Sequence, residues 1–176
     1  MTDSKTEFAQ LEELRKTSPN IVFYIARSKN KNIVVYEGIL AKDVIDPKKP
    51  IDVYWLDIDP EYQKKKRAKG VEVSDREDLN YVEKTMAYGV SAEAKDGAYK
   101  LKLVATPKLD VSMTVVDGFG RLKTRAVCLI NKKKCYLSKI YVQSTDRMIG
   151  LPKVDYIELI GTDVESGAVE KEKING

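Results

Sequence analysis

The sequence has no histidine among its 176 residues. It therefore lacks a Ser-His-Asp or Cys-His nucleophile pair, an imidazole general base and any histidine-ligated metal. Its two cysteines are too few for a closed four-cysteine zinc site. An enzyme of this composition would depend on carboxylates, as in glycoside hydrolysis, and no such pair can be placed in a cleft from the sequence. A non-enzymatic function is therefore favoured.

Long apolar runs are also missing. No run approaches the ~20 residues that a membrane-spanning helix needs, and residues 1–7 lack the basic start and apolar stretch of a signal peptide. These absences predict a cytoplasmic, intracellular protein without a transmembrane segment. The chain length fits one domain, and the apolar content of 43% is sufficient for a core without a metal or disulfide.

Runs of β-branched and aromatic residues dominate the chain after residue 18. Polar turns separate them, and Asp96-Gly97 is the strongest hairpin signal. The last predicted strand covers residues 154–161. About nine strands with short links and no repeated crossover helices predict a mainly β fold, an antiparallel β-sandwich or barrel.

Two helices are expected beside the strands. Residues 1–18 have the apolar spacing of an amphipathic helix, accessory to a single β-rich domain at 19–176. Ser74 and Glu77 have capping-box spacing and predict one internal helix at about 76–87. The polar residues 60–75 before it are interpreted as an exposed basic insertion.

A group of acidic residues lies at the end of the strand predicted at 51–59. Asp57 and Asp59 share one face of an extended strand, and Glu61 follows them. A strand end of this kind can gather oxygen ligands for Ca²⁺, and calcium is the one cofactor that the sequence suggests. The alternative is an exposed strand face that runs into a turn, and flanking lysines favour this alternative.

The net charge of +4 is unevenly distributed. The main cluster of basic residues lies at 64–69, and a second basic run, at 132–134, is assigned to a hairpin turn. The main cluster can hold phosphates or an anionic membrane surface, or it is simply a solvated loop. Few aromatic residues lie beside it, which does not favour sequence-specific nucleic-acid binding. The candidate anion-binding residues are Lys64, Lys65, Lys66, Arg67 and Lys69.

Aromatic residues occur in or beside the strands, together with one arginine that needs a partner. Such aromatics are usually core residues, but in a barrel they can also enclose a ligand whose polar head is oriented by hydroxyls and a guanidinium. The partner of the arginine could equally be a carboxylate across the sheet. The candidate ligand-binding residues are Arg27, Asn30, Asn32, Tyr36, Tyr54, Trp55 and Tyr88.

Cys128 and Cys135 flank the basic hairpin. A two-residue turn at Asn131-Lys132 would place them opposite each other, so that a cross-strand disulfide is geometrically conceivable. Reduced and buried thiols are expected in a protein without an export signal.

Five segments carry a resemblance to a known family. They are FYIARSKNKNIVVYE (23–37), PIDVYW (50–55), AYGV (87–90), INKKKCYL (130–137) and YIELIG (156–161). Together they resemble a family that is classified only as a domain of unknown function. The resemblance implies one intact domain without a fused enzyme. It directs attention to residues 27–36, 54–55 and 88–89, and it assigns no activity.

These features together favour a non-enzymatic binding module that recognises a ligand or partner, with an anionic group as the candidate target: a lipid head group, a phosphate or an acidic protein. A scaffold protein acting through strand edges or the N-terminal helix is one alternative. A calcium-binding β-sandwich that uses Asp57, Asp59 and Glu61 is another.

Overall fold

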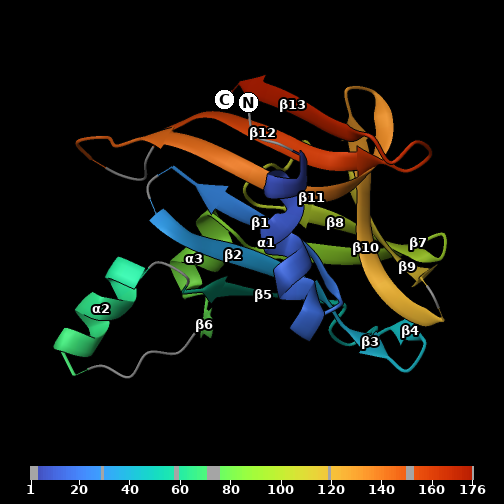
Figure 1. The fold of residues 1–176 in the computed structure, drawn as a ribbon, viewed down its shortest axis with the longest axis horizontal. Coiled ribbons are helices and arrows are strands. Elements are labelled where there is room, and N and C mark those ends of the chain that lie inside the picture. The colour runs from blue at the N-terminus through green and yellow to red at the C-terminus, as the bar shows by residue number, and fades with distance from the viewer. Residues whose placement is uncertain are drawn as a thin grey trace.

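The computed structural model describes residues 4–28, 30–57, 60–70, 76–118, 120–149 and 153–175. These residues form a mainly β structure with three helices and thirteen strands (Figure 1). The helices are α1 (Ser4–Thr17), α2 (Pro60–Ala68) and α3 (Tyr81–Met86). The strands are β1 (Ile21–Arg27), β2 (Asn30–Gly38), β3 (Leu40–Ala41), β4 (Val44–Ile45), β5 (Ile51–Leu56), β6 (Arg76–Asp78), β7 (Val90–Lys95), β8 (Ala98–Leu103), β9 (Val111–Gly118), β10 (Arg121–Ile130), β11 (Lys133–Thr145), β12 (Lys153–Asp163) and β13 (Val169–Asn175).

Eleven strands form one large sheet, and β11 is its central member. The strand order is β6-β5-β2-β1-β11-β10-β9-β8-β7, with β12 on β11 and β13 on β12. Residues 133–136 of β11 pair with β10, whereas residues 139–142 pair with β1. β12 pairs with β11 from Cys135 to Thr145. The two halves of β11 therefore carry two different branches of the sheet.

This topology corrects the predicted strand arrangement. β1 and β11 run parallel, so the sheet is mixed rather than antiparallel, and it is not closed into a barrel. The parallel partner of β1 lies more than a hundred residues away along the chain, where local pattern carries no information about pairing.

The described residues contain thirteen strands instead of about nine. β3, β4 and β6 have only two or three residues each, too few to show a period. β13 has charged residues at four consecutive positions, 170–173, which conceal a strand pattern in the sequence. The last predicted strand, 154–161, is the interior of β12.

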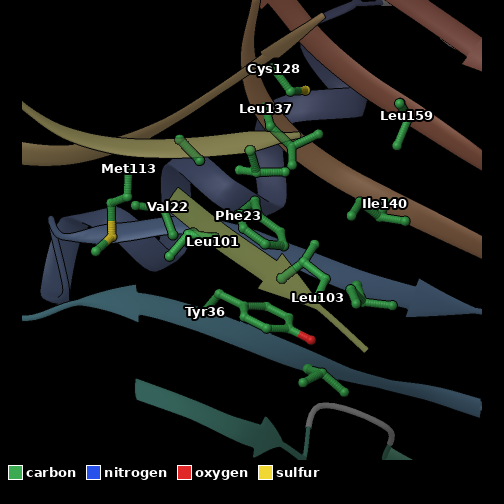
Figure 2. Packing of buried hydrophobic residues seen from close by; sticks show 14 of the residues in the cluster. Val22, Phe23, Tyr36, Leu101, Leu103, Met113, Cys128, Leu137, Ile140 and Leu159 are labelled. Carbon is green, nitrogen blue, oxygen red and sulfur yellow. The ribbon is translucent and has the colours of Figure 1, made fainter. Parts of the chain in front are cut away.

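Two apolar clusters lie on the two faces of the β1–β2–β5 branch, because successive side chains of a strand point to opposite faces. The larger cluster contains Phe23 and Tyr36, whose rings stack with centroids 4.5 Å apart. Figure 2 shows Leu101 and Leu103 of β8 packed in the same cluster, so both branches share one core. On the other face, Leu11 of the N-terminal helix α1 is only 2% exposed.

The basic insertion, for which the sequence predicted exposure but no helix, contains α2. α2 begins at Pro60, whose fixed φ suits the first turn and whose missing N–H would have no partner there. Glu61 lies in the first turn, and the last turn carries Lys65, Lys66 and Arg67. An acidic residue in the first turn and basic residues in the last turn both interact favourably with the helix dipole, which stabilises α2.

The internal helix predicted at 76–87 is shorter and begins later. Its first part is β6, in which Glu77 pairs with Trp55 of β5, so strand pairing displaces the helix there. α3 is capped instead by Asn80, whose side chain accepts a hydrogen bond from the Glu83 N–H at 2.8 Å. The Glu83 carboxylate accepts one from the Asn80 N–H at 2.9 Å, which completes a capping box. Ser74 lies outside the described residues.

Both predicted two-residue turns are present. Asp96 and Gly97 have φ values of 50° and 80° between β7 and β8, and Asn131 and Lys132 have φ values of 53° and 66° between β10 and β11. Positive φ at both central residues is the type I′ geometry that matches strand twist.

Gly161 of β12 lies where a side chain would collide with β11. A Cβ atom there would lie 2.3 Å from the Tyr136 carbonyl oxygen and 2.9 Å from Ile130 Cδ1. We expect Gly161→Ala to lower the free energy of unfolding by about 1–3 kcal/mol, the usual cost of overpacking. Gly118→Ala is the matched control, because a Cβ at Gly118 meets no atom within 4 Å. Urea unfolding followed by circular dichroism measures both, and equal losses would contradict the expectation.

Candidate functional site

One end of the sheet brings together the ends of β1 and β5 and the start of β2. β1 ends at Arg27, and β2 runs antiparallel to both β1 and β5. β11 runs parallel to β1, so its last residues lie at the same end, where the Ser144 N–H donates to Ser28 Oγ at 3.2 Å. We call this region, with the connections that leave it, the Arg27 end.

The Arg27 side chain packs against two adjacent aromatic rings. Its guanidinium carbon is 4.4 Å from the centroid of Trp55 and 5.5 Å from that of Tyr88. The two rings meet edge to face, with centroids 5.3 Å apart. The NH1 group donates a hydrogen bond to the Tyr88 hydroxyl at 3.0 Å. The ring faces stabilise the cation and fix its position. We call these three residues the Arg27 stack.

The Arg27 guanidinium has more donors than the protein uses. A guanidinium carries five N–H donors and no acceptor. Among the described residues, the Tyr88 hydroxyl is its acceptor, and Nε is buried without one. No carboxylate in this part of the chain forms an ion pair with it. A half-buried cation with spare donors and no counter-ion can accept an anionic group.

Neighbouring groups hold the aromatic walls in place. The Tyr36 hydroxyl donates to the Tyr88 carbonyl oxygen at 2.6 Å, which connects β2 to the segment after α3. Trp55 Nε1 donates to Glu83 Oε2 at 2.8 Å, and Glu83 is the residue that closes the α3 capping box. The stack therefore rests on rigid elements on both sides.

Burial keeps the tyrosines of this region neutral. Desolvation raises the pKa of Tyr36 far above its ordinary value, and the charge of an ionised Tyr88 would raise it further. Burial also raises the pKa of Tyr88, although Arg27 acts in the opposite direction. Arg27 thus faces a neutral phenol, not a phenolate counter-ion.

Two of the three acidic candidates, Asp57 and Glu61, lie within the described part of the chain. Asp57 is 2% exposed. Its Oδ1 accepts a hydrogen bond from Asn32 Nδ2 at 3.3 Å, and its Oδ2 lies 3.4 Å from Lys66 Nζ. Glu61 is exposed on α2, and Asp59 lies outside the described residues. In the part of the chain with described placement, no three acidic or cysteine side chains are grouped as metal ligands. Calcium binding stays a prediction.

Tyr54 is separated from the Arg27 stack. Tyr54 and Trp55 are successive residues of one strand, so they point to opposite faces. The Tyr54 hydroxyl donates to Glu37 Oε1 at 2.7 Å, and the Arg76 guanidinium lies 3.8 Å above its ring. Arg76 also forms an ion pair with Asp52. The side chain of Asn30 lies outside the described residues.

Of the seven candidate ligand-binding residues, the structure brings four together: Arg27, Tyr36, Trp55 and Tyr88. Asn32 is at the same end but bonds Asp57. The sequence reading missed Asn80 and Glu83, which support the stack. Their capping-box spacing was a signal that could have identified them.

The basic residues divide into two groups. Lys66 is directed to the sheet, where it pairs with Asp57 and Glu77. The remaining cations on α2 and just after it, namely Lys64, Lys65, Arg67 and Lys69, are exposed. They add positive charge to the Arg27 end, because Lys66 attaches α2 to the ends of β2 and β5.

A pocket of about 520 Å³ lies elsewhere, between β4, β7, β8 and β9. Ile45, Tyr99 and Val115 form its apolar walls, and Lys95 and Asp96 lie at its margin. It shares no residue with the Arg27 stack.

The two cysteines are directly opposite each other in β10 and β11, as the turn predicted. Both are free and buried. Burial raises the pKa of Cys128 to about 12, and it also raises the pKa of Cys135. Because the thiolate is the reactive form, neither sulfur is a ready nucleophile near neutral pH.

A protein-family model described as "Domain of unknown function (DUF4833)" matches residues 23–173. No curated protein and no solved structure matches the chain. The match spans every segment that carried the sequence resemblance. Among the described helices, none combines the length and the apolarity that crossing a membrane requires.

Because the Tyr36 hydroxyl stays neutral in the folded protein, the free energy of unfolding should fall at alkaline pH. Its pKa is raised in the folded state, so the stabilisation is fully present below about pH 10, the pKa of an unfolded tyrosine, and is lost as pH rises further. We expect Tyr36→Phe to lose about 1 kcal/mol at pH 7, the value of its hydrogen bond. Above pH 10 the wild type should lose about 1.4 kcal/mol per pH unit that Tyr36→Phe does not lose, so the difference should vanish and change sign by about pH 11. Urea unfolding at pH 7 and pH 11 measures it, and a constant difference would contradict the assignment.

Proposed function

Because the chain belongs to the family described as Domain of unknown function (DUF4833), which carries no stated activity, we propose its function from the Arg27 stack. It is a non-enzymatic binding module that recognises an anionic group of a ligand or partner. The observation that carries the proposal is the Arg27 guanidinium itself, which contacts Trp55 and Tyr88 and, among the described residues, has spare donors and no carboxylate partner.

A purely structural arginine would be expected to have a different environment. A buried or half-buried charge usually pairs with a carboxylate, since desolvation without compensation is costly. Glu83 lies close to the stack, but its two oxygens accept hydrogen bonds from Trp55 and from the Asn80 backbone. No described carboxylate therefore compensates the positive charge of Arg27, and an anionic group of a ligand or partner can do so.

The geometry suits an oxyanion. A guanidinium recognises carboxylate and phosphate through parallel N–H donors. Contacts with the adjacent rings of Trp55 and Tyr88 restrict the rotation of this one. Such pre-organisation reduces the ordering cost of binding. A lipid head group, a free phosphate and an acidic protein side chain share this chemistry.

Catalysis has less support. Asp57 is paired with Lys66, and Glu83 is committed to the capping box and to Trp55. The two thiols are buried in β10 and β11, with raised pKa values. These groups supply no free acid–base pair beside Arg27.

A scaffold role is the second candidate from the sequence. Leu11 attaches the N-terminal helix to its own sheet, so that face of the helix is occupied. The outer edge of β13 alternates Glu and Lys over 170–173, a pattern that discourages pairing with another strand. These contacts favour binding at the Arg27 stack over binding through the helix or this edge.

Trp55 is the only tryptophan and contacts Arg27, so its fluorescence should report binding at this site. We expect titration with inorganic phosphate, and separately with acetate, to give a saturable change in emission. Arg27→Met should weaken the binding constant at least about tenfold, because one charged hydrogen bond contributes ~1.5–3 kcal/mol. Arg27→Lys should recover only part of it, since an ammonium lacks the planar fork.

The matched control is Lys132→Met, which removes one exposed positive charge at the opposite end of β11. It should bind like the wild type. Circular dichroism and urea midpoints establish that each variant is folded. Equal weakening in Lys132→Met, or unfolding of both Arg27 variants, would show that Arg27 is not a specific anion site.

A further inference from the structure

The connection between β11 and β12 carries two fully exposed apolar side chains. Met148 is 102% exposed and its neighbour Ile149 is 90% exposed. Single apolar residues are common on protein surfaces, but two large adjacent ones at the tip of a projecting connection indicate an interaction site. We call residues 146–149 the apolar tip.

The apolar tip leaves the molecule at the Arg27 end. β11 and β12 remain paired up to Thr145 and Lys153, and Ser144 is hydrogen-bonded to Ser28 of the β1–β2 turn. In Figure 1, the β11–β12 connection and α2 both extend to the left beyond the β1–β2 turn. The tip and the basic helix therefore project in the same general direction.

Exposed basic residues lie in and beside the apolar tip and on α2. Arg147 lies within the tip and Lys153 directly follows the connection, and both are exposed. The exposed α2 cations are Lys64, Lys65, Arg67 and Lys69.

Most acidic groups in the same region have partners. Asp57 and Glu77 are paired with Lys66, and Asp155 accepts a hydrogen bond from the Thr145 hydroxyl at 2.5 Å. Asp146 and Glu61 are the exposed acidic residues among the described ones there. The balance is therefore positive, which suits an anionic surface.

We propose that the apolar tip and the exposed side of α2 dock on an anionic lipid bilayer. Met148 and Ile149 enter the boundary between head groups and acyl chains, and the cations contact lipid phosphates. Apolar side chains that insert shallowly, supported by basic residues, are the two components that stable peripheral binding combines. The surface of a bilayer offers acyl chains to the tip and lipid phosphates to the basic residues at the same time. This surface does not include the Arg27 stack, and it stands whether or not that stack binds anions.

Co-sedimentation of the full chain with vesicles tests the proposal. We expect binding to vesicles of phosphatidylcholine and phosphatidylglycerol at about 7:3, and little binding to pure phosphatidylcholine. Raising salt from about 0.1 M to 0.5 M should weaken binding several-fold, because screening shortens the reach of the cations.

Variants separate the two components. Met148→Ser with Ile149→Ser should lower the partition coefficient at least about tenfold, because two apolar side chains no longer leave water. Lys64→Glu with Lys65→Glu should lower it about tenfold or more on anionic vesicles.

The controls lie at the opposite end of β11. Leu129→Ser removes another exposed apolar side chain, 62% exposed, from β10 next to the distant turn. Lys132→Glu with Lys134→Glu reverses two charges at that turn. The Leu129 control should bind like the wild type, and the charge control should lose much less than the α2 variant.

Three results would overturn the proposal. The first is no sedimentation of the wild type with anionic vesicles, and the second is unchanged binding by the tip variant. The third is a concentration-dependent mass in light scattering that requires Met148 and Ile149 without any vesicle binding, which would assign the tip to a second copy of the chain. Vesicle binding that survives Arg27→Met supports the tip surface even if the Arg27 stack binds no anion.

Discussion

The parallel pairing of β1 with the second half of β11 is the contact on which the Arg27 end of the molecule depends. It places residues 24–27 beside residues 139–142, although they are more than a hundred positions apart in the chain. Because β10 occupies the first half of β11, the same strand joins both branches of the sheet. Arg27 and the β11–β12 connection consequently leave the sheet at one end. Neither local turn chemistry nor strand periodicity could produce this juxtaposition.

Packing and electrostatics act together at that end. Trp55 and Tyr88 fill apolar space beside the core, and at the same time their rings hold the Arg27 guanidinium. Their polar atoms are satisfied by Glu83 and by Arg27. Arg27 therefore contacts two aromatic rings and one hydroxyl, and no described carboxylate pairs with it. This environment differs from an ordinary ion pair, in which each charge satisfies the other.

The charges that give the net charge of +4 are distributed unevenly over the structure. Acidic groups near α2 are matched by Lys66, and those beside the Asn131 turn are matched by Lys133 and Asn131. Unmatched positive charge remains on the outer side of α2 and at the connection that follows β11. At this connection, Arg147 directly precedes the exposed Met148 and Ile149 in the chain. A positive charge and exposed apolar side chains thus occur together there.

The sequence by itself determined the mainly β character, the N-terminal helix, the family and the two type I′ turns, because periodicity and turn residues act over a few positions. It also placed Arg27, Tyr36, Trp55 and Tyr88 among seven candidate ligand-binding residues, without separating these four from the other three. Only the tertiary structure decided that Tyr54 lies on the other face and that Asp57 pairs with Lys66. It likewise decided that residues 76–78 form a strand, since pairing with β5 outweighs helix capping there. Such outcomes depend on contacts between distant segments, which no local pattern records.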